Sequence, residues 1–180
     1  MPVNTANRRQ AEDKNGSILF PETERQAAMF KHILLATDGS AASQHAAQMA
    51  VDMARIHGAR LTALYVVDPY PYLGISETNP LGFQSYMAAA REHATQAHAK
   101  VAELCSQGGA PVALQTRIVE DLSASEGIVQ TARDEGANLI VMGSHGRTGL
   151  ARFVVGSVAS KVLAAAPVPV LVVRQGGSDE

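Results

Sequence analysis

The chain has 180 residues, with 15 Lys and Arg against 17 Asp and Glu, so its formal net charge is -2. This length fits one domain with some additional chain, and the lack of a basic excess argues against DNA or RNA as a partner. Hydrophobic residues make up 46% of the sequence. No apolar run reaches the ~18 residues needed to cross a bilayer, so we expect no membrane-spanning segment.

The single cysteine, Cys105, cannot form an internal disulfide, which suits a reducing compartment. We expect its side chain to pack as a small hydrophobe. The first residues, MPVNTANRRQAEDKNGS, lack the apolar core of a secretory signal. We therefore predict a cytoplasmic protein with a polar N-terminal extension (1–30), one folded domain (31–175) and a C-terminal tail (176–180).

Two short apolar runs open the predicted domain, KHILLAT (31–37) and RLTALYVV (60–67). Runs of this kind are typical of buried parallel strands. Between them the sequence predicts a helix that Ser40 or Ser43 caps and Gly58 ends. Its expected buried face contains Ala46, Met49 or Ala50, Met53 and Ile56.

A long loop is expected next, because residues 68–82 contain three prolines and two glycines, which disfavour a helix or a central strand. A long helix should then run from about Phe83 to Gln107, where Gly108 and Gly109 end it. Its expected buried stripe consists of Met87, Ala90, Ala94, Ala97, Val101 and Leu104.

The third strand is predicted at VALQTRIV (112–119), where apolar and polar residues alternate. Alternation indicates one wet face, and hence a strand near an edge of the sheet. Ser123 or Ser125 then begins a helix that Gly136 ends.

The fourth strand is predicted at residues 139–142, the most uniformly apolar run. Gly156 and Ser157 begin a last helix, which continues to about Ala165. The fifth strand is VPVLVV (168–173), where proline removes a backbone donor and favours an edge position.

This alternation of strands and helices predicts a single doubly wound α/β domain, with a five-stranded parallel sheet and helices on both faces. We expect the spatial strand order 3-2-1-4-5, in which the winding reverses between strands 1 and 4. Ligands bind beyond the carboxyl ends of strands at such a switch point. Those ends lie at Thr37–Asp38 and Met142–Gly143.

The most informative motif is LIVMGSHGRTGLARFVVGSVAS (139–160), in which Gly143, Gly146 and Gly156 follow the spacing G-x2-G-x9-G-S. Glycine backbone beside a helix N-terminus can hold phosphate, because the first amides of a helix have no acceptor within it. A side chain at position 143 would crowd a ligand against the sheet, so we expect glycine to be needed there. We expect Gly146 either to adopt positive φ or to let a phosphate contact the backbone. Ser157 adds a hydroxyl donor and Arg147 a guanidinium.

Each of these features also has a purely structural interpretation: a glycine can end a strand or cap a helix, and Asp38 can serve a turn. Alternatively, Asp38 would bind a ribose, or a metal together with phosphates. The backbone amide and carbonyl of Val66, at the end of the second strand, would bind an adenine edge. The motifs G-x4-G-K-[ST] and G-x-G-x-x-G are absent, so neither a P-loop nor the usual dinucleotide site is expected.

The sequence indicates no catalytic residue. His145 lies alone in the glycine loop without a nearby carboxylate, which is more typical of a loop residue than of a general base. No Ser-His-Asp set and no Cys/His metal spacing is visible.

At this point the chain resembles the universal stress protein family, from about Lys31 to Arg174. The resemblance is carried by HILLATDGS, ALYVVD, ANLIVMGSHGRTGLARFVVGSVASKVL and PVPVLVVR. The glycine spacing is similar to that of the ATP-binding branch. The family often has a glycine after the third strand, where this chain has Glu120 and Asp121.

The resemblance implies a binding site in which Ala36, Thr37 and Asp38 line the adenosine and Val66 contacts adenine. Met142 and Gly143 would flank base and sugar, and the phosphates would be held by Gly146, Gly156, Ser157 and Val158. It also implies a homodimer formed by pairing of the last strands, 168–173, and an unpaired apolar edge there would favour such pairing.

We thus predict an ATP-binding regulatory protein of the stress response, with Mg²⁺ as a candidate second ligand. One alternative is a slow ATP hydrolase in which Asp38 and Mg²⁺ polarise a phosphate. The other is an interaction protein that uses the dimer edge and the 1–30 arm to bind an unknown protein partner, with ATP irrelevant.

Overall fold

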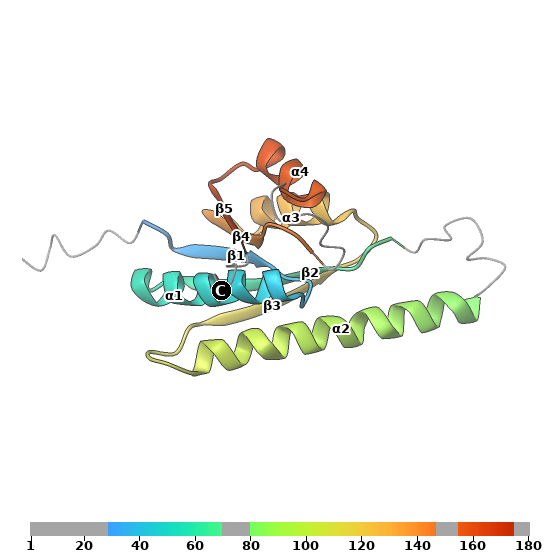
Figure 1. The fold of residues 1–180 in the computed structure, drawn as a ribbon, viewed down its shortest axis with the longest axis horizontal. Coiled ribbons are helices and arrows are strands. Elements are labelled where there is room, and N and C mark those ends of the chain that lie inside the picture. The colour runs from blue at the N-terminus through green and yellow to red at the C-terminus, as the bar shows by residue number, and fades with distance from the viewer. Residues whose placement is uncertain (1–28, 70–79, 147–154, 175–180) are drawn as a thin grey trace, which may run out of the picture.

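The structure is a computed structural model that describes residues 29–69, 80–146 and 155–174. Figure 1 shows strands and helices in alternation along these ranges. The bounds are β1 (His32–Ala36), α1 (Ala41–His57), β2 (Arg60–Val66), α2 (Pro80–Ser106), β3 (Leu114–Val119), α3 (Ala124–Asp134), β4 (Leu139–Gly143), α4 (Ser157–Ala165) and β5 (Val170–Val173).

The strands form one parallel sheet in the order β3-β2-β1-β4-β5, which confirms the predicted topology. Central strand β1 is buried along its whole length. Its last residue, Ala36, lies opposite Leu64 of β2 and Met142 of β4. The winding reverses between β1 and β4, so the carboxyl ends of these strands frame the expected crevice.

Helices cover both faces of the sheet: α1 and α2 pack on one, α3 and α4 on the other (Figure 1). Each face has its own apolar core. Ile33 and Leu35 point into the first, and Leu34 points into the second, as the alternation of side chains along a strand requires. Cys105 belongs to the first core, where burial raises the pKa of its thiol, as expected for a packed, unreactive cysteine.

The buried face of α1 differs from the predicted one. Ser40 caps the helix and Gly58 ends it in the left-handed conformation, as predicted. Met49 and Ile56, however, are 45% and 65% exposed. Small residues take their place against the sheet and α2, and a helix that packs this closely favours alanine over longer side chains. The buried residues are Ala42, Ser43, Ala46, Ala47, Ala50, Val51 and Ala54.

The long helix α2 begins at Pro80, inside the segment predicted to be loop. Proline is tolerated in the first turn because the amide it lacks would have no acceptor within the helix. Figure 1 shows the first turns of α2 running beyond the end of the sheet. Accordingly, Leu81 is 74% exposed and Ala94 is the first described side chain of the helix to be buried. The predicted loop residues 70–79 lie outside the described ranges.

Ala94, Ala97 and Val101 of the predicted α2 stripe are buried, and the other members pack partly against the cores. Arg55 of α1 holds the end of the helix: its guanidinium donates to the carbonyl oxygens of Leu104 (2.6 Å) and Gln107. An arginine on a neighbouring helix thereby satisfies carbonyls that the last turn leaves without partners.

Edge strand β3 is more exposed than its alternation predicted, since even Ile118 is 40% accessible. After it, Asp121 is the only described residue other than glycine with positive φ, at 65°. Ser123 then caps α3 in a capping box with Glu126. Gly136, with φ of 64°, follows the end of that helix, as predicted.

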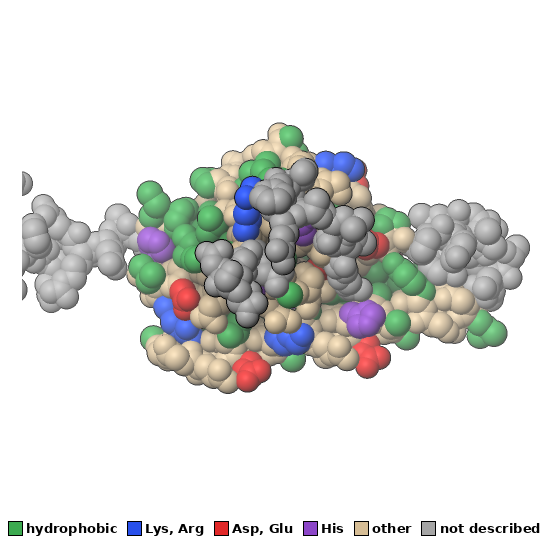
Figure 2. All heavy atoms as spheres, viewed as in Figure 1, with side chains coloured by type: hydrophobic (Ala, Val, Ile, Leu, Met, Phe, Trp, Pro, Cys, Tyr) green, Lys and Arg blue, Asp and Glu red, His purple; other side chains and the backbone are tan. Residues whose placement is uncertain are grey.

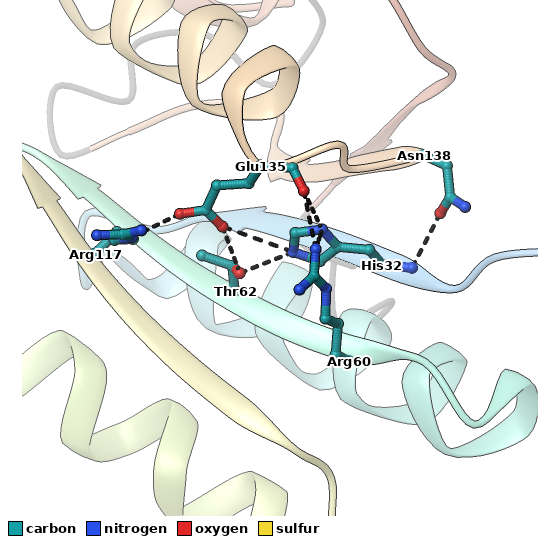
Figure 3. A network of polar contacts seen from close by, with 6 residues as sticks. All are labelled: His32, Arg60, Thr62, Arg117, Glu135 and Asn138. Carbon is teal, nitrogen blue, oxygen red and sulfur yellow. Dashed lines mark hydrogen bonds and ion pairs between the residues drawn. The ribbon is translucent and has the colours of Figure 1, made fainter.

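A polar network with His32 and Thr62 buried at its centre joins the sheet to the end of α3 near the amino ends of β1 and β2 (Figure 3). His32 Nε2 lies 2.8 Å from Thr62 Oγ1, whose hydroxyl donates to Glu135 Oε2. Glu135 also accepts from Arg117 Nε, while Arg60 Nη2 donates to His32 Nδ1 over 2.8 Å. Burial and the charge of Arg60 lower the pKa of His32, so the ring is neutral.

Acidic and basic side chains are interspersed on the described part of the face shown in Figure 2, in keeping with the small net charge. Within the described ranges, no helix combines the length and apolar character required to cross a bilayer.

Candidate functional site

A cavity of about 430 Å³ lies where β1, β2 and β4 end, at the carboxyl edge of the sheet. The topology and the glycine motif both led to this location from the sequence. Among the described residues, all the predicted site residues except Thr37 line the cavity, namely Ala36, Asp38, Val66, Met142, Gly143, Gly146, Gly156, Ser157 and Val158.

Thr37 serves the turn after β1 and does not line the cavity. Its amide donates to the carbonyl of Leu64 over 2.9 Å, and its hydroxyl donates to Ser43 Oγ and accepts from the Gly39 amide. The side chain is therefore held within the protein. Arg147 lies outside the described residues.

Apolar side chains form one wall of the cavity: Leu64 and Val66 from β2, Met142 from β4, and Ala124 and Ile128 from α3. The contribution of α3 was not predicted. It depends on Gly127, where a Cβ would lie only 3.0 Å from Val66 Cγ2, so glycine lets the first turn of α3 approach β2 closely. A glycine inside a predicted first turn is the signal that would have revealed this contact.

The backbone of Val66 faces the side of β2 from which β1 has turned away. The described ladder between these strands ends with the bond from Thr37 N to Leu64 O. The backbone groups of every second residue point to the same side of a strand. The amide and carbonyl of Val66 therefore point to the same side as those of Leu64. The next residue, Val67, points to the other side, where its amide donates to the carbonyl of Val119 in β3. Val66 thus presents a donor and an acceptor side by side at the cavity.

The three glycines of the motif have steric roles within the protein itself. A Cβ at Gly143 would meet backbone of Ala42 and His145 at 3.1 Å. Gly146 does not have positive φ, and its Cβ would lie 2.8 Å from Asp38 Oδ2. A Cβ at Gly156 would lie 2.9 Å from the Ser144 carbonyl oxygen. The absence of a Cβ at these three positions therefore allows the loop, Asp38 and the start of α4 to pack closely together.

Not all amides of this region are available to a ligand. The amide of Gly156 donates to Ser144 O (2.9 Å), and that of Ser144 donates to Val173 O (2.8 Å). The first hydrogen bond of α4 runs from Ser160 N to Gly156 O, so the amides of residues 157–159 precede the helical ladder. Gly156 caps the helix without a side-chain hydrogen bond. The candidate anion site therefore narrows to the first residues of α4, of which Ser157, Val158 and Ala159 line the cavity.

Two carboxylates line the cavity, Asp38 after β1 and Asp68 after β2, and sequence analysis gave Asp68 no role. Asp38 Oδ1 accepts from the Ser40 amide (3.0 Å), and Tyr86 donates to the carbonyl of Asp68 (2.7 Å). In the part of the chain that the structure describes, no group of three or more His, Cys, Asp or Glu side chains could hold a metal ion by itself.

A doubly wound α/β domain with a cavity at its switch point defines a broad class of ligand-binding proteins. The family model described as the universal stress protein family matches residues 29–174, and the chain belongs to this family. It is 37% identical to a universal stress protein of Methanocaldococcus jannaschii over 147 residues, which cover 82% of this chain and 84% of the relative. The family resemblance stated from the sequence is thereby confirmed.

Solved structures agree with this assignment. The structure of universal stress protein UspA from Lactobacillus plantarum is 32% identical, with a TM-score of 0.65, and the match covers 80% of this chain and 97% of that one. A universal stress protein in complex with cAMP is 21% identical and has a TM-score of 0.57 over 81% of this chain and 97% of that one. One from Archaeoglobus fulgidus in complex with dAMP is 20% identical, with a TM-score of 0.58 over 81% and 98%. These two establish the shared fold.

Proposed function

We propose that this protein binds an adenine nucleotide, ATP foremost, in the cavity at the carboxyl edge of the sheet, and that it acts as a cytoplasmic regulatory protein of the stress response. The observation that carries the proposal is the combination of two features in one cavity. Val66 offers backbone groups beside an apolar wall, and the first turn of α4 offers amides that precede the helical ladder.

The Val66 end of the cavity suits adenine. A backbone amide and carbonyl on one side of a strand match the neighbouring acceptor N1 and donor N6 of the adenine edge. Val66, Ile128 and Met142 supply apolar contacts for the faces of a flat base. Guanine has a donor and an acceptor in the opposite order, so this pair of backbone groups favours adenine.

The opposite part of the cavity suits phosphate. The amides of residues 157–159 point out of the helix N-terminus, where the partial positive charge of the helix favours an anion by about 0.3–1 kcal/mol at an exposed site. The Ser157 hydroxyl adds a donor. We propose that Asp38, which also lines the cavity, accepts a hydrogen bond from a ribose hydroxyl. We propose Arg147 as a further phosphate contact.

Support also comes from the family fold, since the cAMP and dAMP complexes named above are adenine nucleotide complexes. Mg²⁺ usually binds proteins through one or two carboxylates and the phosphates of a substrate. A carboxylate such as Asp38, which lines the cavity, fits that chemistry, so we propose Mg²⁺ as the counter-ion of ATP here.

Calorimetric titration with ATP, ADP and AMP tests the proposal, with Gly156→Ala as the diagnostic variant. The added Cβ would lie 2.9 Å from the Ser144 carbonyl, so the start of α4 must move. We expect a loss of affinity of at least ten-fold. Gly136→Ala, whose added Cβ meets no atom within 4 Å but whose φ of +64° strains an alanine, controls for a loss of stability away from the cavity. Unchanged affinity in Gly156→Ala would remove this site from consideration.

We further propose a homodimer formed by antiparallel pairing of β5 strands. Strand β5 is an edge of the described sheet, and its four residues are all only partly buried. The bonds from Ile140 N to Pro169 O and from Ser144 N to Val173 O show that odd-numbered residues of β5 face β4. The backbone groups of Val170 and Val172 therefore point outward.

Val172→Pro tests this arrangement because it removes one outward amide and leaves the β4 ladder intact. We expect the protein to sediment as a monomer. Val172→Ala loses side-chain packing but keeps the amide, and it should remain dimeric. A dimer that persists in Val172→Pro would show that another surface mediates association.

A further inference from the structure

His145, to which sequence analysis assigned no role, lines the cavity, and its ring nitrogen Nε2 is buried. Nε2 has no hydrogen-bond partner among the described residues. Nδ1 lies 3.2 Å from Ser144 Oγ. A buried polar atom without a partner costs about 1–3 kcal/mol, so such an atom in a cavity wall points to a missing ligand atom.

The Ser144 hydroxyl determines which tautomer of His145 leaves the fewest groups unsatisfied. Ser144 is 4% exposed, and His145 Nδ1 is the partner described for its hydroxyl oxygen. If the hydroxyl donates to Nδ1, the ring proton resides on Nε2 and only that one N–H lacks a partner. If Nδ1 carried the proton, both the hydroxyl proton and the Nε2 lone pair would lack partners. His145 is therefore assigned a donor at Nε2.

The ring lies beside the N-terminus of α4. Its Cδ2 atom, which is bonded to Nε2, is 3.7 Å from the position of a Cβ on Gly156, the N-cap of that helix. The neighbouring amides of residues 157–159 are also donors that precede the helical ladder. Taken together, His145 Nε2 and these amides are donors, and a phosphate offers only acceptors to them, whereas a ribose or an adenine also carries donors.

We infer that His145 donates a hydrogen bond from Nε2 to a phosphate group of the bound ligand and so discriminates nucleotides from nucleosides. This inference rests on the proposed nucleotide site. It adds a side-chain donor, held in position by Ser144, to the backbone donors of α4.

The test compares binding of adenosine, AMP and ATP to the wild-type protein and to His145→Leu, which removes the donor. A hydrogen bond to a charged group is worth enough to expect about a ten-fold loss of AMP and ATP affinity. Adenosine affinity should remain within about two-fold of wild type, because adenosine does not contact the donor cluster. His145→Gln, which restores an N–H near the position of Nε2, should recover part of the loss. His93→Leu on the exposed face of α2 is the control.

Equal losses for adenosine and AMP would overturn the inference, because they would show that His145 only supports the cavity wall. Unchanged AMP affinity in His145→Leu would overturn it as well. Wild-type protein that binds none of adenosine, AMP and ATP would instead refute the proposed function, and the inference with it.

Nitrogen NMR of the wild-type protein gives a second test that needs no variant. We expect His145 to show a protonated Nε2 without ligand, and a shift of this nitrogen with AMP that adenosine does not produce. A protonated Nδ1 and a bare Nε2 would contradict the inference.

Discussion

Asp121 is the residue with the most costly backbone conformation among those described, with φ of 65° directly after β3. An aspartate tolerates this left-handed region better than most residues, but glycine occupies it without a steric penalty. The family resemblance had already marked a missing glycine at this turn. The positive φ at this turn is the physical reason for a glycine there.

We predict that Asp121→Gly raises the free energy of unfolding by about 0.5–1 kcal/mol, because relief of the left-handed strain exceeds the added entropy of the unfolded chain. Urea denaturation measures the difference. Asp134→Gly, the same exchange in the last turn of α3, should lower stability by a few tenths of a kcal/mol. A lower free energy of unfolding in Asp121→Gly would show that interactions of the aspartate side chain stabilise the protein by more than the left-handed backbone conformation costs.

The glycines of the motif line the cavity at the switch point, but they could not be given steric roles from spacing alone. Gly143, Gly146 and Gly156 each avoid a contact with another part of the protein, and those parts are far apart in sequence. Thr37 matched the family pattern, yet its hydroxyl is engaged with Ser43. Such distinctions depend on neighbours that only the folded chain brings together.

At the scale of elements, strand and helix periodicity predicted every element of the described domain, and glycines and serines predicted most helix ends. The wrong predictions concern long side chains on α1 and the proline that begins α2. Met49 and Ile56 fit a helical stripe by hydropathy, but close packing of α1 leaves room only for smaller residues. Pro80 resembles a loop signal, yet it occupies the one helical position where its missing amide costs little.

Arg55 provides a test at this scale, because it joins the end of α1 to the end of α2. Its guanidinium donates to the carbonyls of Leu104, Gln107 and Ala110, and its side chain is only 15% exposed. We predict that Arg55→Ala lowers the free energy of unfolding by about 2 kcal/mol in thermal or urea denaturation.

Arg133→Ala serves as the matched control, because Arg133 makes a single bond of 3.4 Å to the Ala165 carbonyl at an exposed site. We expect a change below about 0.5 kcal/mol for that variant. Similar effects for the two arginines would mean that the carbonyls at the end of α2 are satisfied equally well by water.

At the scale of the whole molecule, the two ends of the sheet have different chemistry. The carboxyl ends of the strands open into the cavity, whereas the network around His32 closes the amino ends of β1 and β2 against α3 (Figure 3). Burial lowers the pKa of His32, with a further contribution from Arg60, and burial also lowers the pKa of His98 on α2. Both rings are therefore neutral in the folded protein.

This pattern predicts that acid destabilises the protein. Because the pKa of each ring is lower in the folded protein than its ordinary value of 6.5, the unfolded chain binds more protons as the pH falls below that value. The stabilisation is complete above pH 6.5 and is lost on acidification, with a slope of up to about 1.4 kcal/mol per pH unit for each ring.

Urea denaturation between pH 7.5 and pH 5 measures this slope. His32→Gln should lower stability at pH 7.5 but make the dependence on pH shallower, whereas the exposed control His93→Gln should leave the slope unchanged. An unfolding free energy that is constant or rises on acidification would contradict neutral, buried rings.

The central claim is that one cavity holds both ends of an adenine nucleotide, and a crystal structure of the protein grown with ATP tests it most directly. We predict adenine against the backbone of Val66 and phosphate oxygens at the amides of residues 157–159, with His145 Nε2 in hydrogen-bond contact. An empty cavity at saturating ATP, or a nucleotide bound elsewhere on the protein, would contradict the claim.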